Sequence, residues 1–131
     1  MGDEDLMQMA VSAMPNAYAP YSDFPVGAAI LDEHGAIHTG VNVENAAYPQ
    51  GSCAEAGAIA AMVMQGARRI EAIAVAGKGE LLCTPCGGCR QRIREFASPS
   101  TRIIIGDENG IRQIFTIEDL LPSSFGPDNL S

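Results

Sequence analysis

Three cysteines and one glutamate are the residues of this chain whose types and spacing could do chemistry. Cys53 stands two positions before Glu55, and a later Pro-Cys-x-x-Cys segment contributes Cys86 and Cys89. Three thiolates fill three corners of the tetrahedron that Zn²⁺ prefers and leave the fourth corner open, which is typical of a catalytic rather than a structural zinc site. Glu55 is close enough to reach a water in that corner without binding the metal. The pattern predicts one zinc ion per chain, held by Cys53, Cys86 and Cys89.

The fourth cysteine, Cys83, leaves two interpretations open. It is either a buried thiol without a metal or a fourth zinc ligand, and we favour the thiol because a closed site would leave Glu55 without a purpose. A redox or iron–sulfur Cys-x-x-Cys is the alternative for Cys86 and Cys89. The additional Cys53, followed by Glu55, argues against it.

The ligand cysteines are expected at the N-termini of two helices, where the positive end of the helix dipole favours a thiolate. The first helix should run from residue 53 to about 65, with Gly66 at its C-terminal end. Its residues are apolar on nearly every face, so we expect it to be central and buried. The second should span 86–96 and stop before Ser98-Pro99.

The remaining elements follow from hydrophobic periodicity. An amphipathic helix is expected over residues 3–14, and an Asp32-Glu33-His34-Gly35 turn should join the first two strands. His34 and His38 are expected to be exposed and without a catalytic role. Alternating strands and helices predict a single α/β domain over 1–131 with a mixed sheet. The buried face of the helix over 3–14 should carry Leu6, Met9, Ala10 and Ala13. Strands are expected at 26–31, 36–43, 70–76, 101–105 and 111–116.

Composition excludes several classes of partner. The net charge is −8 and only eight residues are Lys or Arg, whereas binders of polymeric nucleic acid carry a basic surface. The longest apolar run is too short to span a bilayer, so we expect no membrane partner. The first residues are acidic where a secretory signal would be basic. These features predict a soluble cytoplasmic protein that acts on a small molecule.

The Cys-x-Glu and Pro-Cys-x-x-Cys pair resembles the zinc-dependent nucleoside and nucleobase deaminases. Segments 21–28, 42–48 and 120–127 are similar to motifs of the small homotetrameric cytidine deaminases. The resemblance implies a three-layer α-β-α sandwich with a mixed five-stranded sheet. It also implies hydrolytic deamination of cytidine and 2′-deoxycytidine to uridine and 2′-deoxyuridine, with release of ammonia, in pyrimidine salvage. The implied assembly is a homotetramer whose sites are shared between subunits.

The resemblance also assigns roles by position. Glu55 would take a proton from the zinc-activated water, pass it to N3 of the base and then protonate the departing amine. Seven further residues would contact the substrate: Phe24 on the pyrimidine ring, Asn42 and Glu44 at the ribose 3′-hydroxyl, the Ala54 N–H at O2, the Thr84 carbonyl near the exocyclic amine, Phe125 in a neighbouring subunit's site, and Tyr48 near the interface.

One position departs from the family pattern. In much of the family an Arg follows the Glu and hydrogen-bonds the cysteine sulfurs, but this chain has Ala56 there. Three thiolates leave a zinc site net negative and weaken the metal as a Lewis acid. We expect the helix dipoles, with or without a basic group from elsewhere, to offset that charge. Arg68, Arg69, Arg90 and Gln91 are expected to play supporting roles.

Two alternative functions stay open. The first is a blasticidin-type or other aminated-heterocycle deaminase, which the Asn42–Asn45 segment and the Phe125-Gly126-Pro127 ending disfavour. The second is a structural zinc module that binds a partner, which would need Cys83 as its fourth ligand. A polynucleotide editor fits less well, because the charge is acidic and no His occupies the first ligand position.

Overall fold

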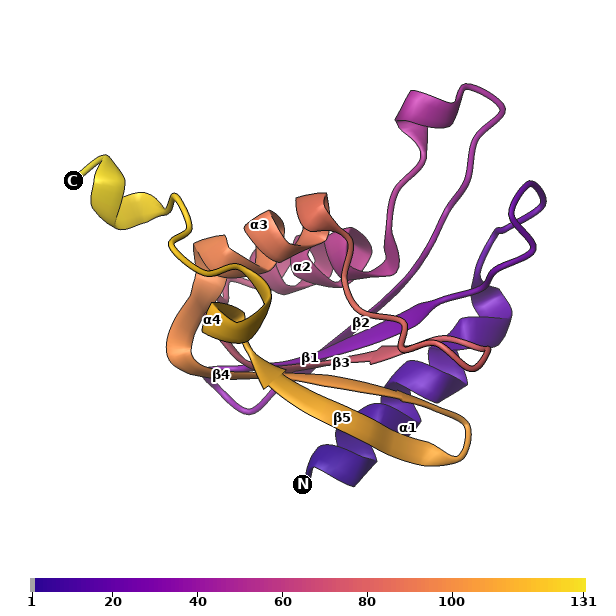
Figure 1. Cartoon of the computed structure of the whole chain (residues 1–131), viewed down its shortest axis with the longest axis horizontal. Helices are drawn as coiled ribbons and strands as arrows, with labels where there is room; N and C mark the ends of the chain where they lie inside the picture. The colour runs from indigo at the N-terminus through magenta and orange to yellow at the C-terminus, as the bar shows by residue number, and fades with distance from the viewer. Residues whose placement is uncertain (1) are drawn as a thin grey trace.

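A five-stranded mixed sheet forms the centre of the computed structural model, which describes residues 2–131 (Figure 1). The strand order is β2-β1-β3-β4-β5, with β3 and β4 parallel and the other neighbouring pairs antiparallel. This confirms the predicted mixed sheet, whose first two strands form an antiparallel hairpin. The strands are β1 Gly27–Asp32, β2 Ile37–Val41, β3 Ile70–Ala76, β4 Ala97–Asp107 and β5 Gly110–Thr116.

Helices cover both faces of the sheet and complete the predicted three-layer sandwich. Helix α1 lies on one face, and α2 and α3 lie on the other (Figure 1). Among residues 2–131 no helix combines the length and the apolar character needed to cross a bilayer. The α-helices are α1 Asp3–Ala13, α2 Ala54–Met64, α3 Gly87–Phe96 and α4 Ile117–Leu120, and short 3₁₀ turns are η1 Met14–Asn16, η2 Tyr48–Gln50 and η3 Pro127–Asn129.

The side chains of β3 show how the two cores are divided. Alternate residues of a strand point to opposite faces of its sheet. The alanines at 72, 74 and 76 pack with α1, whereas Ile73 and Val75 pack in the core beneath α2 and α3. Every residue of β3 except Glu71 is buried, as expected for a strand covered on both sides.

A glycine on β2, Gly40, lets helix α2 approach the sheet closely. A Cβ atom at Gly40 would lie 2.4 Å from the Ala58 nitrogen and 2.5 Å from the Ala54 carbonyl oxygen. Both of those atoms belong to the backbone of α2, which cannot move aside without shifting the helix. Gly40 therefore fixes where the N-terminal half of α2 rests.

Two predictions about buried helix faces are wrong. Helix α1 buries Leu6, Met7 and Ala10 and leaves Met9 exposed, because its sequence is apolar enough to offer two overlapping stripes. Helix α2 is buried only on its sheet side, and its last residue, Met64, is 82% exposed. Within residues 2–131 no further element covers the outer side of α2, although that side is apolar as well.

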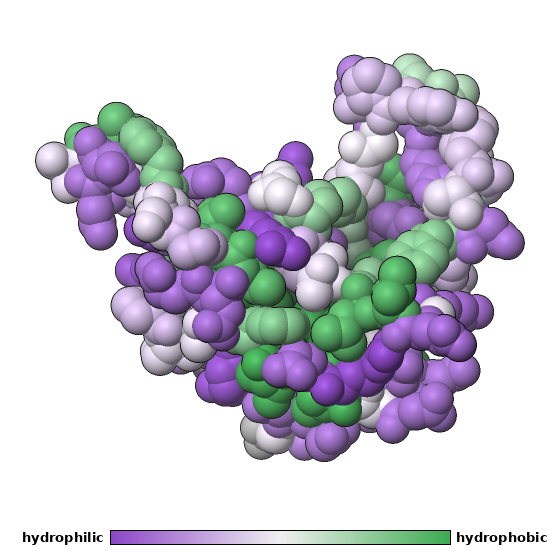
Figure 2. Space-filling view, viewed as in Figure 1, coloured by the Kyte–Doolittle hydropathy of each residue, from purple (hydrophilic) through white to green (hydrophobic). Residues whose placement is uncertain are grey.

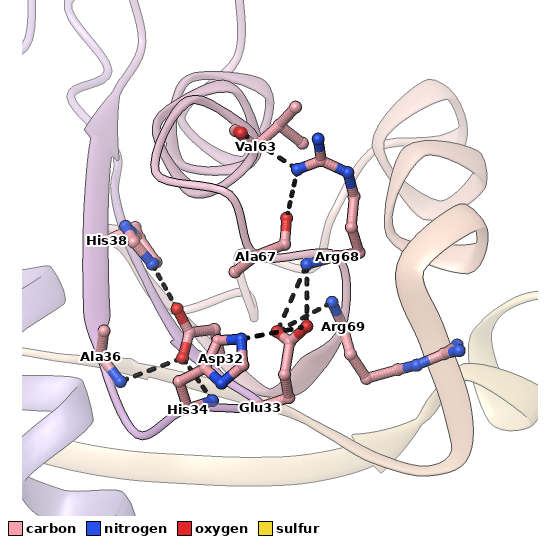
Figure 3. Close-up of polar contacts among 9 residues, drawn as sticks. All are labelled: Asp32, Glu33, His34, Ala36, His38, Val63, Ala67, Arg68 and Arg69. Carbon is pink, nitrogen blue, oxygen red and sulfur yellow. Dashed lines mark hydrogen bonds and ion pairs between the residues drawn. The ribbon is translucent and has the colours of Figure 1, made fainter.

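The prediction for His38 is also wrong, whereas His34 is exposed as expected. His38 is buried, and its Nε2 lies 2.7 Å from Oδ2 of the buried Asp32 (Figure 3). Register pairs His38 with Ile30, whose side chain lies in the core beneath α2, so His38 shares that face. Burial alone would raise the pKa of Asp32, but hydrogen bonds from His38 and from the Ala36 and His34 N–H groups lower it.

The neighbouring Glu33 ties the β1–β2 hairpin to the end of α2. Its carboxylate accepts hydrogen bonds from the backbone N–H groups of Arg68 and Arg69, at 3.0 and 3.1 Å (Figure 3). Arg68 in turn donates from Nη1 to the Val63 and Ala67 carbonyl oxygens. This agrees with the supporting role expected for Arg68 at the negative end of the α2 dipole.

Asp32→Asn is expected to lower the free energy of unfolding by about 2 kcal/mol at neutral pH, because it removes charge-assisted hydrogen bonds. The folded-state pKa of Asp32 is lowered, so this stabilisation is present above the unfolded-state value of about 3.9 and is lost as pH falls through the folded-state value. Urea unfolding at pH 7 and pH 3 checks the sign. The exposed Glu71→Gln is the control, and an Asp32→Asn deficit equal at both pH values would contradict the ionic explanation.

Candidate functional site

The ligand cysteines meet where the N-termini of α2 and α3 come together. Cys53 is the N-cap residue of α2, Cys86 is the N-cap residue of α3, and Cys89 lies in the first turn of α3. Their three Sγ atoms lie within 4.8 Å of one another, and those of Cys53 and Cys86 are 3.9 Å apart. A tetrahedral ion with Zn–S bonds of about 2.3 Å places sulfurs about 3.8 Å apart. The donor set and its spacing therefore fit zinc.

Hydrogen bonds fix the backbone just before Cys53 and just before Cys86. Before Cys53, the chain is closed by paired backbone hydrogen bonds between Val43 and Ser52, both 2.9 Å long. Before Cys86, Arg90 donates from Nε to the Pro85 carbonyl oxygen at 2.7 Å and from Nη2 to Thr84 Oγ1 at 3.3 Å. The ligands therefore sit on braced segments of backbone.

Burial and hydrogen bonding act differently on the three thiols. Burial raises the pKa of Cys53 and of Cys89, whereas the Cys89 backbone N–H lowers the pKa of Cys86. The helix N-termini alone therefore do not favour three thiolates. A bound divalent cation supplies the charge that does, and its binding displaces the protons.

Glu55 lies beside this cluster in the first turn of α2 and is only 4% exposed. Burial raises the pKa of its carboxyl group, and the positive charge of Arg92 partly opposes that effect. Glu55 therefore does not lie on a solvated face of α2. A buried carboxyl group next to a metal site is suited to exchanging protons with whatever occupies the open corner.

Cys83 is not one of the three clustered sulfurs found within residues 2–131. Burial and the nearby charge of Glu55 raise the pKa of the Cys83 thiol to about 11. Its side chain packs against Gly77, where an added Cβ would lie 2.7 Å from the Cys83 Sγ and 3.6 Å from the ring of Phe24. Cys83 and Phe24 therefore lie close together beside Gly77.

Asn42 and Glu44 brace the loop that carries Phe24. Asn42 donates from Nδ2 to the Phe24 carbonyl oxygen at 2.9 Å and accepts from the Val26 N–H at 2.8 Å. Glu44 accepts from the Tyr21 and Ser22 N–H groups and from the Ser22 hydroxyl, and these hydrogen bonds, led by that of the hydroxyl, lower its pKa. Both residues thus have a positioning role that the sequence did not reveal.

Two segments project from the sheet on the side of α2 and α3. One is the loop that carries η2, and the other is the C-terminal segment that carries η3 (Figure 1). Figure 2 shows the surface hollowed between them. The projecting segments carry Tyr48, which is 74% exposed, and Phe125, which is 57% exposed. Within one chain these two aromatic side chains are therefore left largely uncovered.

The sequence model of the zinc-binding region of cytidine and deoxycytidylate deaminases matches residues 1–106. The chain belongs to this deaminase family. Its cofactor is zinc, for which Cys53, Cys86 and Cys89 form the fitting site.

Relatives in the family match along most or all of the chain. A cytidine deaminase of Sporosarcina psychrophila is 41% identical over 131 residues, covering 100% of this chain and 96% of the relative. One of Mycobacterium tuberculosis is 41% identical over 122 residues, covering 92% of this chain and 87% of the relative. The crystal structure of cytidine deaminase from Burkholderia pseudomallei aligns with a TM-score of 0.90 at 38% identity, covering 95% of this chain and 100% of that one. These matches confirm the predicted fold.

Helix α3 of this deaminase contributes supporting contacts beyond its two ligands. Arg90 donates from Nη1 to the Leu120 carbonyl oxygen at 2.9 Å, and Gln91 donates to the Phe125 carbonyl oxygen at 2.8 Å. Arg94, which sequence reasoning missed, donates to the Ser124 hydroxyl at 2.9 Å. The polar side of α3 therefore anchors the C-terminal segment. The sequence signal for this role is the run of polar residues Arg90, Gln91 and Arg94 after Cys89.

Metal analysis of two cysteine variants tests the ligand set. Cys89→Ser is expected to lose most of its zinc because a neutral hydroxyl replaces one of three thiolates. Cys83→Ser should keep one zinc per chain, as the unaltered protein does. Atomic absorption on dialysed protein measures both. Equal loss from the two variants would instead show a four-cysteine structural site.

Proposed function

We propose that this chain is a cytidine deaminase that converts cytidine and 2′-deoxycytidine to uridine and 2′-deoxyuridine and releases ammonia. The observation that carries the proposal is the buried Glu55 carboxyl beside three sulfurs at two helix N-termini. Family membership and cytidine deaminase relatives that cover the whole chain support the same substrate. We assign the activity to a single domain over 1–131, in the cytoplasm and in pyrimidine salvage.

Zinc, when held by Cys53, Cys86 and Cys89, supplies a Lewis acid that makes a water nucleophilic at neutral pH. Glu55 accepts a proton from that water and donates it to N3 of the pyrimidine, which makes C4 electrophilic. The resulting hydroxide forms a bond to C4, and the same carboxyl then carries the remaining proton of that hydroxyl to the exocyclic amine as the C4–N bond breaks. One water is consumed and one ammonia leaves, so Glu55 ends the cycle in its starting state.

Residues around the sulfurs are suited to hold the nucleoside. The Ala54 N–H lies in the first turn of α2, where backbone donors have no acceptor within the helix, and it can donate to the pyrimidine O2. The Thr84 carbonyl oxygen can accept from the exocyclic amine, and Phe24 offers a ring face to the base. Asn42 and Glu44 can reach the ribose 3′-hydroxyl while they brace the loop of Phe24.

Glu55→Gln is expected to lower kcat for cytidine by about 10²–10⁴-fold, because an amide cannot shuttle protons. The variant should retain one zinc per chain, since Glu55 is not a ligand. The loss of ultraviolet absorbance on conversion of cytidine to uridine gives the rate, with the exposed Glu108→Gln as the control. Turnover by Glu55→Gln at the unaltered rate would refute the assignment.

The same proposal includes a homotetramer whose sites are shared between subunits. Tyr48 and Phe125 are exposed on the two segments that border the hollowed surface of Figure 2. Helix α2 ends in the exposed Met64. Exposed apolar groups of this extent mark surfaces that contact a partner. Cys86 is itself exposed in one chain, although deamination chemistry benefits from exclusion of bulk water. A neighbouring subunit would supply that cover.

Site sharing is tested by combining two impaired variants in one oligomer. Phe125→Ala is expected to lower kcat/KM about tenfold, because an aromatic contact with the substrate site is lost. Co-expression of Phe125→Ala with Glu55→Gln should give hybrid oligomers that turn over cytidine faster than the average of the two parents. Each parent expressed alone under two different affinity tags is the control. Activity equal to the parental average would show that each chain completes its own site.

A further inference from the structure

The zinc site has an unbalanced charge that its first helix does not relieve. Three thiolates around a divalent cation leave a net negative group, which weakens the metal as a Lewis acid. Ala56 lies next to Glu55 in the first turn of α2, and its methyl group cannot donate a hydrogen bond to sulfur. A donor for the sulfurs therefore has to come from outside α2.

Helix α3 places such a donor on one of the ligands. The Arg92 Nη1 lies 3.6 Å from the Cys89 Sγ, within hydrogen-bonding distance for a sulfur acceptor. Cys89 is completely buried, so bulk water does not solvate its sulfur. A guanidinium N–H is then the group that can disperse the charge of this thiolate.

The side chain of Arg92 is folded back toward the N-terminus of α3. A Cβ atom at Gly88 would lie 3.3 Å from the Arg92 Nη1, so the guanidinium extends over the first turn of the helix. A positive charge there is disfavoured by the helix dipole unless an anion lies close by. The thiolate of Cys89 is such an anion.

The other arginines of α3 have different partners. Arg90 donates to the Pro85 and Leu120 carbonyl oxygens, and Arg94 donates to the Ser124 hydroxyl. Both hold segments of backbone or a surface loop. Arg92 differs from them in that it donates to the sulfur of a metal ligand.

We propose that Arg92 is a positioning residue of the zinc site, which rests on the proposed deaminase function. Its guanidinium donates to the Cys89 sulfur, which holds that ligand in place and offsets part of the negative charge of the three-thiolate site, so that the metal is retained and stays electrophilic. Ala56 of α2 cannot donate a hydrogen bond to a ligand sulfur, and Arg92 of α3 makes that hydrogen bond instead.

The test compares zinc release from Arg92→Met, Arg92→Lys and the unaltered protein. Arg92→Met keeps a long unbranched side chain but removes the charge and the donors. Its zinc should pass to a chromogenic chelator about 10–100-fold faster, the range found when a partner of a metal ligand is removed. Arg92→Lys restores the charge and should release zinc at an intermediate rate. The control is Arg102→Met, because Arg102 pairs with Asp3 on the α1 side of the molecule.

A spectroscopic readout separates this role from general destabilisation. In the Co²⁺-substituted protein, removal of the donor to Cys89 should shift the thiolate-to-cobalt charge-transfer band to lower energy in Arg92→Met but not in Arg102→Met. In the zinc enzyme, kcat for cytidine should fall with KM little changed, since the substrate is not touched. Unchanged release and an unchanged cobalt band in Arg92→Met would overturn the proposal even if the unaltered enzyme deaminates cytidine. Identical behaviour of Arg92→Lys and Arg92→Met would overturn the assignment to charge.

Discussion

The structure depends on holding three sulfur atoms and one carboxyl group together at the junction of two helices. Each of these groups is an acid, and burial raises the pKa of Cys53, Cys89 and Glu55. The ionised form of the cluster is therefore unfavourable unless a positive charge lies nearby. The fold meets this by directing the N-termini of α2 and α3 toward one point on one face of the sheet. The close contact at Gly40 and the β3-α3-β4 crossover are what bring those two helix ends together.

The parts that the sequence predicted are those with local signals. Strand β3 is apolar except for Glu71, and β4 contains the apolar run 103–105. The spacing of Cys-x-Glu and Pro-Cys-x-x-Cys is typical of a zinc site, so the sheet and the sulfur cluster could be predicted. The burial of His38 could not, because it depends on its register with Ile30 and on the position of Asp32 at the strand end. The buried face of α1 was misplaced for a related reason: only the packed sheet distinguishes two similar apolar stripes.

Residues far apart in the chain support the site through contacts to backbone atoms. Arg90 donates to the Leu120 carbonyl oxygen and Asn42 donates to that of Phe24. Because every residue has a backbone carbonyl, the sequence does not indicate which one will accept such a hydrogen bond. Resemblance to a family implies a substrate role for Asn42 and Glu44, whereas the geometry shows that they also hold the loop of Phe24 in place. Loss of one of them would therefore disturb orientation as well as binding, since a catalytic geometry depends on its supporting contacts.

Charge balance at the metal need not come from one fixed position in the sequence. Because α2 and α3 meet at the sulfurs, a cationic side chain in the first two turns of either helix can reach a ligand, and Arg92 does so from α3. The absence of a basic residue at position 56 is then compatible with an intact site. What the chemistry requires is a donor at the sulfur, and helix geometry, in which residues three apart are neighbours, allows position 92 to provide it for Cys89.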